Sequence, residues 1–287
     1  MKISIISELL YLFFIRIPFS ILGFIRGNLI FVHWGRGLNN FGDCLQPDIL
    51  RCYGFTPVYV PQRRSDVVLA GSILQWVPSD YKGIILGTGG GEQNYDFPNA
   101  YIVGVRGELS LSRLKQESVI GVVGDPGLIM NKVFPDKVDK TNQLGVIPHF
   151  VDKDHVILRQ WAARFGKDSL LIDVLRNPRD VIHDIKSCEY IVSSSLHGLI
   201  IADAFDIPNA RFVIRETMPT EFYDYKFKDY YSSLLSEDMP LEAEGSETLD
   251  DLINMTRLHS QEVRVLQDRL DRALSSLSGL IKQRRRR

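Results

Sequence analysis

Apolar runs of strand length alternate with stretches of helical periodicity over the first half of the chain. Runs rich in Val and Ile that end in glycine or polar residues predict buried strands, and their alternation with helices predicts a parallel sheet covered on both faces. The strands are predicted at LIFVHWG, DVVLAGSI, KGIILGTGG, YIVGV and VIGVVG. Helices are predicted after the loop NNFG and within GELSLSRLKQ.

A second alternation of the same kind begins after a polar stretch, Lys132 to Gln143, which we interpret as a link. Its strands are predicted at LGVIPHF, SLLIDVL, EYIVSS and ARFVIR, and its helices at RDVIHDIKSC and HGLIIADAFD. Two such units in tandem predict an α/β fold of two domains that face a cleft. Ligands of such folds bind outside the carboxyl ends of the parallel strands.

The beginning of the chain departs from this pattern. Residues 1–28 are strongly apolar, but Glu8, Arg16 and Arg26 interrupt the run, and Pro18 is expected to break a helix. Two interpretations remain open: an interfacial segment with its arginines at lipid headgroups, or a helix packed on the protein's own core. The predicted organisation is this segment, a first αβ domain over 29–138, a second over 139–240, and a linker with an amphipathic helix over 241–287.

The last segment shows heptad periodicity and ends in four arginines. Apolar residues occupy a and d positions of one frame, which Thr256 and His259 interrupt. These residues are Leu249, Leu252, Val263, Leu266, Leu270, Ala273, Leu277 and Leu280. The helix is either a self-association surface that makes the chain a homo-oligomer or a helix packed on the domains. The tail, Arg284 to Arg287, either contacts anionic lipid or is a solvated end.

Composition narrows the class of protein. The chain has 34 Lys and Arg against 35 Asp and Glu, so no nucleic-acid partner is expected. Three cysteines in 287 residues do not suggest a disulfide framework, and no group of Cys and His has the spacing of a zinc site. We therefore expect a cytoplasmic protein without a metal, peripheral at the inner face of the cytoplasmic membrane if the apolar segment docks there.

The stretch SSSLHG, between a predicted strand and a predicted helix, is the strongest candidate site. A helix N-terminus presents unpaired N–H groups and a partial positive charge, which favour a phosphate or a carboxylate. Ser193, Ser194 and Ser195 supply hydroxyls, Gly198 permits a close approach, and His197 supplies the type of side chain best suited to proton transfer. The alternative interpretation is a capped helix with a half-buried histidine.

Polar residues at other predicted strand ends support a site. Asn40 and Asp43 follow the first strand, and Arg106 follows the strand YIVGV, where it is suited to hold a carboxylate or phosphate through two N–H bonds. His149 lies at the end of the first strand of the second domain, with Asp152 three residues further on. The GTGGG loop lacks the glycine fingerprint and the lysine of nucleotide-binding loops. Together these side chains are expected to face the predicted cleft.

Taken in order, seven stretches resemble the polysaccharide pyruvyl transferase family, above all the branch that decorates bacterial exopolysaccharide repeat units. They are NNFGDCLQP, GTGGG, GVRGELS, VVGDPGLI, VIPHFVD, SSSLHGLIIADAFDIPNA and KFKDYYSSL. The resemblance covers Leu29 to Leu235 and implies two Rossmann-like domains of the glycosyltransferase-B type. It also implies transfer of the enolpyruvyl unit of phosphoenolpyruvate to two hydroxyls of one sugar, with formation of a cyclic ketal and release of phosphate. No cofactor is expected, and a lipid-linked saccharide is the expected acceptor.

The resemblance also implies roles for particular residues. His197 is the general acid/base, and His149 is a second candidate for this role. The expected donor-binding residues are Arg106, Ser194, Ser195, Leu196 and Gly198, and the expected acceptor-binding residues are Asn40 and Asp43. Family members often have an arginine where this chain has Ser195. Candidates to replace that cation are Arg211, Arg215 and Lys226.

Two other functions remain open at this point. A nucleotide-sugar glycosyltransferase of the same architecture needs a carboxylate for the ribose, for which Glu189, Asp203 and Asp206 are the nearest candidates. A non-catalytic polysaccharide-assembly protein would use the apolar terminus and the heptad helix as interaction surfaces.

Overall fold

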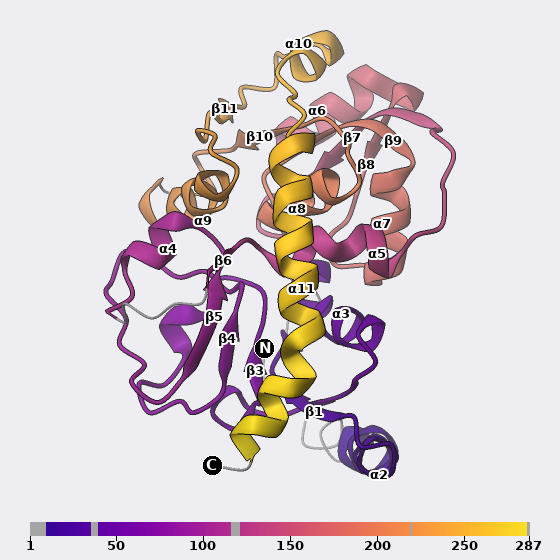
Figure 1. Cartoon of the computed structure of the whole chain (residues 1–287). Helices are drawn as coiled ribbons and strands as arrows, with labels where there is room; N and C mark the ends of the chain where they lie inside the picture. The colour runs from indigo at the N-terminus through magenta and orange to yellow at the C-terminus, as the bar shows by residue number, and fades with distance from the viewer. Residues whose placement is uncertain (1–9, 36–39, 116–120, 219, 286–287) are drawn as a thin grey trace. The chain divides into compact units, whose positions relative to one another are not determined.

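The computed structural model of the chain describes residues 10–35, 40–115, 121–218 and 220–285 and is an α/β structure with two parallel sheets (Figure 1). The chain divides into two units. Unit 1 consists of Met1–Asn39, Asp43–Pro126 and Asp268–Arg287, and unit 2 consists of Asn40–Gly42 and Gly127–Gln267. The predicted α/β class is confirmed, and each unit, with its own parallel sheet and helices, is compatible with a Rossmann-like domain.

Unit 1 is built on a six-stranded parallel sheet of order β2-β1-β3-β4-β5-β6. The strands are β1 (Leu29–Val32), β2 (Thr56–Tyr59), β3 (Val67–Val68), β4 (Ile84–Leu86), β5 (Tyr101–Val105) and β6 (Val122–Val123). Residues of β3 and β4 are fully buried, as expected for strands covered on both faces. The sequence did not predict β2, which contains Pro57; an edge strand tolerates proline because one side of it forms no ladder hydrogen bonds.

The helical segments of unit 1 are short and follow the strands. They are α3 (Gln46–Cys52), η3 (Gln62–Arg64), η4 (Leu74–Trp76) and α4 (Glu108–Ser112). η5 (Pro126–Ile129) and η2 (Phe41–Cys44) each cross from one unit to the other.

The apolar segment at the amino terminus is helical from Leu10 to Ile25. It comprises a π-helical turn, η1 (Leu12–Arg16), followed directly by α2 (Ile17–Ile25). The expectation that Pro18 would break the helix is wrong, because the helix continues through it; the π-helical turn directly before Pro18 is the local irregularity at which the proline is accommodated. Within the described residues, no helix is long and apolar enough to cross a membrane.

Unit 2 contains a five-stranded parallel sheet of order β11-β10-β9-β7-β8. The strands are β7 (Asn142–Ile147), β8 (Ser169–Leu171), β9 (Cys188–Ser193), β10 (Asn209–Val213) and β11 (Leu241–Glu242). The helical segments are α5 (Met130–Val133), α6 (Val156–Phe165), η6 (Gly166–Asp168), α7 (Pro178–Lys186), α8 (Leu196–Ala204), α9 (Thr220–Ser233) and α10 (Leu249–Asn254). All nine residues of α8 are buried, because it is apolar on every side and lies inside the unit.

The boundary between the units lies at Pro126 rather than at the predicted position after residue 138. The polar stretch that we interpreted as a link belongs to unit 2. Lys186 in α7 donates a hydrogen bond to the carbonyl of Phe134 at 2.9 Å, and Arg179 lies over the Phe134 ring at 5.4 Å. These contacts hold the stretch on unit 2 although its composition is that of a linker.

The C-terminal helix, α11 (Ser260–Arg285), contributes its first residues to unit 2 and the remainder to unit 1. Its heptad positions are buried within the chain: Val263, Leu266, Leu270 and Leu277 are 2%, 4%, 0% and 0% exposed. Of the two interpretations of the heptad pattern, the structure therefore supports a helix that packs on the rest of the chain. Self-association stays a prediction, but the buried heptad positions are not exposed to form its contact surface.

Candidate active site

The carboxyl edge of the sheet of unit 2 brings two histidines together. β7 and β9 pair so that Ile147 lies opposite Ser193, which places His149 and His197 just beyond the ends of adjacent strands. The two side chains are 7% and 8% exposed. Each has a buried ring nitrogen that lacks a hydrogen-bond partner among the residues described, Nδ1 in His149 and Nε2 in His197. Buried polar atoms are normally paired, so these nitrogens are available to a ligand or a water molecule.

Ser194 fixes the loop that carries His149. Its hydroxyl accepts a hydrogen bond from the His149 N–H at 2.8 Å and donates one to Asp152 Oδ2 at 2.6 Å. The other carboxylate oxygen of Asp152 accepts from the Thr217 hydroxyl. Burial raises the pKa of Asp152, and the bonds from Ser194 and Thr217 oppose this rise. Thr217 has no role that the sequence alone predicts, because its loop lies 65 residues beyond Asp152 and no local pattern links them.

The other two serines do not cap the helix in the expected way. Ser195 is the N-cap residue of α8, but its side chain makes no capping hydrogen bond. The Ser193 hydroxyl accepts from the Ser195 N–H at 3.0 Å and donates to the Ile147 carbonyl at 2.9 Å. Gly198 is needed for this turn, because a Cβ there would lie 2.3 Å from Ser193 Oγ. The serines therefore shape the junction, and Leu196, the first residue of α8, is buried beside them.

The two imidazoles are electrostatically linked. Burial, with smaller contributions from the nearby charges of Lys226 and His197, lowers the pKa of His149 to about 3. His149 is therefore a neutral imidazole at pH 7, able to accept a hydrogen bond or a proton.

A segment from the first loop of the chain completes this edge. Asn40–Gly42 belongs to unit 2, where the Phe41 N–H donates to the carbonyl of Val174, beyond β8, at 2.9 Å. The Phe41 ring centroid lies 6.4 Å from that of His197. A Cβ on Gly42 would lie 2.0 Å from His197 Cγ, so only glycine fits here without moving the imidazole. Asn40 is buried at the start of this segment.

The carboxyl edge of the sheet of unit 1 carries a buried guanidinium. Arg106 follows β5, is 0% exposed, and donates to the Ser72 hydroxyl at 2.6 Å. A Cβ on Gly89 would lie 2.2 Å from Arg106 Cζ, so the glycine loop makes room for this side chain. Asp43 lies at the same edge, because a Cβ on Gly71 would be 3.5 Å from its Oδ1. The structure therefore places Asp43 with Arg106 in unit 1 and Asn40 with His197 in unit 2.

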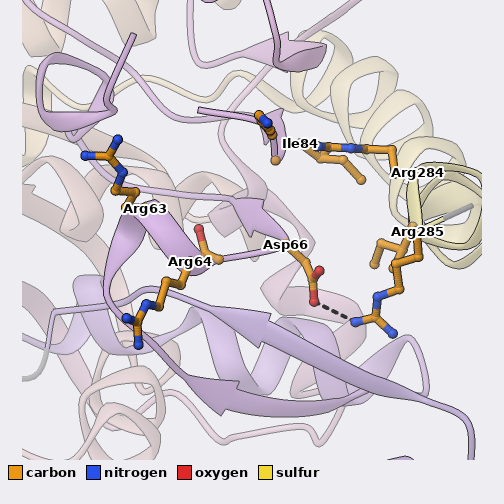
Figure 2. A pocket seen from close by; sticks show the side chains of 10 residues that line it. Arg63, Arg64, Asp66, Ile84, Arg284 and Arg285 are labelled. Atoms are coloured by element: carbon orange, nitrogen blue, oxygen red, sulfur yellow. Dashed lines mark hydrogen bonds and ion pairs between the residues drawn. The ribbon is translucent and has the colours of Figure 1, made fainter. Parts of the chain in front are cut away.

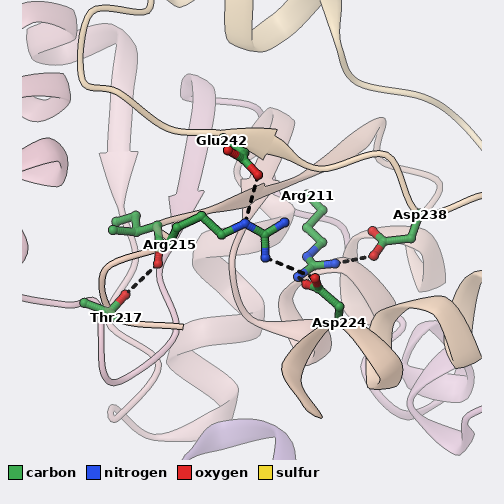
Figure 3. Close-up of polar contacts among 7 residues, drawn as sticks. Arg211, Arg215, Thr217, Asp224, Asp238 and Glu242 are labelled. Atoms are coloured by element: carbon green, nitrogen blue, oxygen red, sulfur yellow. Dashed lines mark hydrogen bonds and ion pairs between the residues drawn. The ribbon is translucent and has the colours of Figure 1, made fainter. Parts of the chain in front are cut away.

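Two of the three candidate replacement cations are held by carboxylates (Figure 3). Arg211, 2% exposed, pairs with both Asp224 and Asp238. Arg215 pairs with Asp224 at 3.0 Å and with Glu242 at 2.9 Å. Burial opposes the ionisation of Asp224, but the hydrogen bond and charge of Arg211, aided by Arg215, lower its pKa below the ordinary value. These arginines stabilise β10, α9 and β11 and have their charge compensated.

The third candidate, Lys226, lies on the side of His149. Its Nζ is 4.9 Å from the centroid of the Tyr223 ring, and that ring lies edge-on to His149 with centroids 5.8 Å apart. The influence of Lys226 on the pKa of His149 agrees with this placement. Of the three, Lys226 is the cation suited to act beside the histidines.

The carboxylates considered for a ribose do not serve this edge. Asp203 is buried in a core network in which it accepts from Asn209 Nδ2 at 2.7 Å and from Tyr230 Oη at 2.5 Å, with His259 Nδ1 at 3.2 Å. Asp206 pairs with Arg264 at the surface at 3.2 Å. Glu189 is exposed near the start of β9, away from the carboxyl end of that strand, so none of these three described carboxylates supports ribose binding at this edge.

The structure defines the chain as an α/β protein with two parallel sheets and a pair of buried histidines at one carboxyl edge. The particular family follows from comparison with known sequences. The family model described as polysaccharide pyruvyl transferase matches residues 10–214, and the chain belongs to this family. The match begins within the apolar helix, so it reaches further toward the amino terminus than the resemblance seen in the motifs.

Two relatives share part of the chain. An uncharacterized protein of Acanthamoeba polyphaga mimivirus is 33% identical over 169 residues, which cover 54% of this chain and 55% of the relative. The succinoglycan biosynthesis protein ExoV of Rhizobium meliloti (strain 1021) is 28% identical over 186 residues, 61% of this chain and 57% of the relative. The chain thus spans a little more than half the length of these relatives. No solved structure matches it.

Proposed function

We propose that this chain transfers the pyruvyl group of phosphoenolpyruvate to two hydroxyls of one sugar in a polysaccharide repeat unit. The product is a cyclic ketal, and inorganic phosphate is released. The observation that carries the proposal is the pair of buried imidazoles with unpartnered nitrogens in a chain of the polysaccharide pyruvyl transferase family. The name of the relative from succinoglycan biosynthesis supports a polysaccharide as the acceptor.

The proposed chemistry uses the two imidazoles in different protonation states. Protonated His197 donates a proton to the methylene carbon of phosphoenolpyruvate, which makes the adjacent carbon electrophilic. One sugar hydroxyl adds to that carbon and gives its proton to neutral His149. The second hydroxyl displaces phosphate from the same carbon and returns a proton to His197. The proton on His149 leaves with the phosphate, so two C–O bonds form, one C–O bond breaks, and both imidazoles return to their first state.

The low pKa of His149 in the free protein is consistent with a site that binds an anion. Burial disfavours the protonated ring, and the positive charge of Lys226 disfavours it further. A bound phosphoenolpyruvate brings negative charges next to both groups, which raises the pKa of His149 toward the range of a working base. The donor therefore activates the residue that takes the proton from its acceptor.

Lys226 is the proposed substitute for the arginine that family members often carry at the position of Ser195. It is proposed for its place beside the Tyr223 ring, which contacts His149, and for its charge, which acts on His149. The donor's phosphate is proposed to meet Lys226, Ser194, Ser195, and the backbone at Leu196 and Gly198. Arg106 is proposed to bind another acidic group of the donor, and Asn40 and Asp43 to bind the sugar. A glycosyltransferase-B-like arrangement with a shared cleft is part of this proposal.

The experiment has two parts, donor class and reaction. Thermal unfolding of the full chain is measured with phosphoenolpyruvate and, separately, with UDP-glucose, because selective binding raises the melting temperature. Phosphate release from phosphoenolpyruvate is then measured with a panel of free and lipid-linked saccharides, and the ketal is detected by the NMR signal of its new methyl group. Stabilisation by the nucleotide sugar and not by phosphoenolpyruvate would reject the proposal.

A further inference from the structure

A pocket rich in cations lies at the amino edge of the sheet of unit 1, the edge opposite to the one that carries Arg106 (Figure 2). Its volume is about 170 Å³, room for a phosphate group, and five of its lining side chains are basic while one is acidic. The basic residues are Arg63, Arg64, Lys82, Arg284 and Arg285, and the acid is Asp66. The first three precede β3 and β4, and the last two come from the final turn of α11.

The carboxylates near this pocket compensate only part of its charge. Arg285 pairs with Asp66 at 2.8 Å, and Arg63 pairs with an exposed carboxylate, Asp80. Arg64, Lys82 and Arg284 form no ion pair with any residue in the described part of the chain. Five cations that share one pocket with a single carboxylate, Asp66, repel each other, and an anion in the pocket relieves that repulsion. Phosphate oxygens are the acceptors that a group of arginines binds best.

The apolar helix α2 lies on the same edge of the sheet. Gly23 packs directly on the starts of β1 and β2, because a Cβ there would lie 2.9 Å from Thr56 Cβ and 3.1 Å from Leu29 Cα. Arg285 reaches from the pocket to the start of β1, on which the helix packs, since its Nη2 donates to the Leu29 carbonyl at 3.2 Å and also to Asp66. The cations and the helix therefore form one continuous surface of unit 1.

This helix exposes large apolar side chains over most of its length. Phe14 is 74% exposed, Phe24 79% and Ile25 76%. The others with more than a third of their surface exposed are Leu10, Phe13, Ile15, Ile17, Phe19, Ile21 and Leu22. The described part of this helix, Leu10 to Ile25, measures about 24 Å, and its exposed apolar side chains suit it to the plane of an interface.

We propose that this edge of unit 1 docks on an anionic phospholipid surface, with α2 in the interface and lipid phosphates in the basic pocket. Cations alone would serve a soluble phosphate compound equally well. The exposed apolar helix on the same edge favours lipid, because large apolar patches on a protein surface mark an interaction site. The inference goes beyond pyruvyl transfer and does not depend on it.

The test is co-sedimentation of the full chain with vesicles of phosphatidylcholine, with and without phosphatidylglycerol. The variant Arg64→Gln/Lys82→Gln/Arg284→Gln removes the three cations without ion pairs. Each charge near an anionic surface contributes about fivefold in affinity, so this variant binds phosphatidylglycerol vesicles roughly a hundredfold more weakly. The control Lys153→Gln/Arg159→Gln/Lys167→Gln removes the same charge from exposed positions of unit 2 and binds as the wild type does.

The helix is tested separately with Phe14→Ser/Phe24→Ser. Both side chains are largely exposed, so the folded protein tolerates the change, and thermal unfolding confirms this. Loss of two buried aromatic rings weakens binding at least about tenfold. This loss is expected on both kinds of vesicle, because the apolar contribution does not require anionic lipid.

Inorganic diphosphate separates the two sources of phosphate. If diphosphate stabilises the wild type but not the triple variant, and no vesicle binds, the pocket serves a soluble compound and the membrane assignment is wrong. Equal binding of vesicles by wild type and triple variant would also overturn it. Neither outcome bears on pyruvyl transfer, because the assay contains no donor and no saccharide.

Discussion

The carboxyl edges of the two parallel sheets carry side chains of different chemical types. The edge of unit 2 holds His149 and His197, which can move protons, and the edge of unit 1 holds Arg106, a permanent cation fixed by Ser72. In both units a glycine leaves the room that the functional side chain occupies: Gly42 beside His197 and Gly89 beside Arg106. The difference is between side chains that can exchange a proton and a fixed guanidinium, so under the proposed function substitutions in the two units should have different kinetic signatures.

The largest effect is expected from His197→Ala. Loss of a positioned acid/base group lowers the turnover number by about 10² to 10⁴, with little change in the KM for phosphoenolpyruvate. Phosphate release with a competent saccharide measures it. The control is His183→Ala, which removes an exposed histidine from α7 of the same unit and leaves turnover unchanged. Full turnover of His197→Ala would remove unit 2 from the chemistry.

The second effect is expected from Gly42→Ala, which adds one methyl group against the imidazole of His197. Displacement of a catalytic group by about 1 Å costs roughly a hundredfold in rate, so the turnover number falls although no functional atom is removed. The same assay is used, with circular dichroism to confirm the fold. A variant as fast as the wild type would show that the position of His197 does not matter.

The counterpart in unit 1 is Gly89→Ala, which displaces the guanidinium of Arg106. If unit 1 binds rather than reacts, this variant raises a KM by about tenfold and leaves the turnover number within a factor of a few. Steady-state kinetics in both substrates shows which KM changes. A loss of turnover number as large as that of Gly42→Ala would show that the two edges do not differ in this way.

A similar shift is expected from Lys226→Gln, within unit 2. Removal of one charge-assisted contact to the donor's phosphate raises the KM for phosphoenolpyruvate by about tenfold. Lys228→Gln, an exposed change two residues further along α9, is the matched control and has no effect. Equal kinetics of the two variants would exclude Lys226 as the cation that replaces the family's arginine.

The smallest effect is expected on the pH dependence of the free energy of unfolding. Because the pKa of His149 is about 3 in the folded protein and 6.5 ordinarily, the unfolded chain binds a proton that the native state does not as the pH falls below 6.5. The native state therefore loses stability between pH 6.5 and 3, and the loss is smaller in His149→Gln. Urea unfolding of both proteins at several pH values isolates this difference. An equal loss in both proteins would show that His149 is not buried as a neutral ring.

The strand ends that carry chemistry were predictable, and their side-chain contacts were not. The runs that end at His149 and Ser193 predict strands through local periodicity, and the structure has them as β7 and β9. The serines were expected to cap α8, but Ser194 binds Asp152, 42 residues earlier in the chain. Local sequence gives no signal for such a partner.

The position of the first loop in the structure could not be predicted from the sequence either. Asn40 and Asp43 were expected together on the acceptor side, yet Asn40–Gly42 lies in unit 2 and Asp43 in unit 1. The fit of Gly42 against His197 depends on a contact between residues that are far apart in the chain. The compensation of Arg211 and Arg215 by acids of α9, β11 and the loop before β11 is another long-range effect, and it leaves Lys226 as the candidate.

The most direct measurement is a crystal structure of the chain with phosphoenolpyruvate or a stable analogue bound. The account predicts the donor's phosphate at the N-terminus of α8, within reach of Lys226, and its methylene carbon beside Nε2 of His197. A phosphate found at the basic pocket of unit 1 alone, with the histidine pair empty, would contradict the central claim.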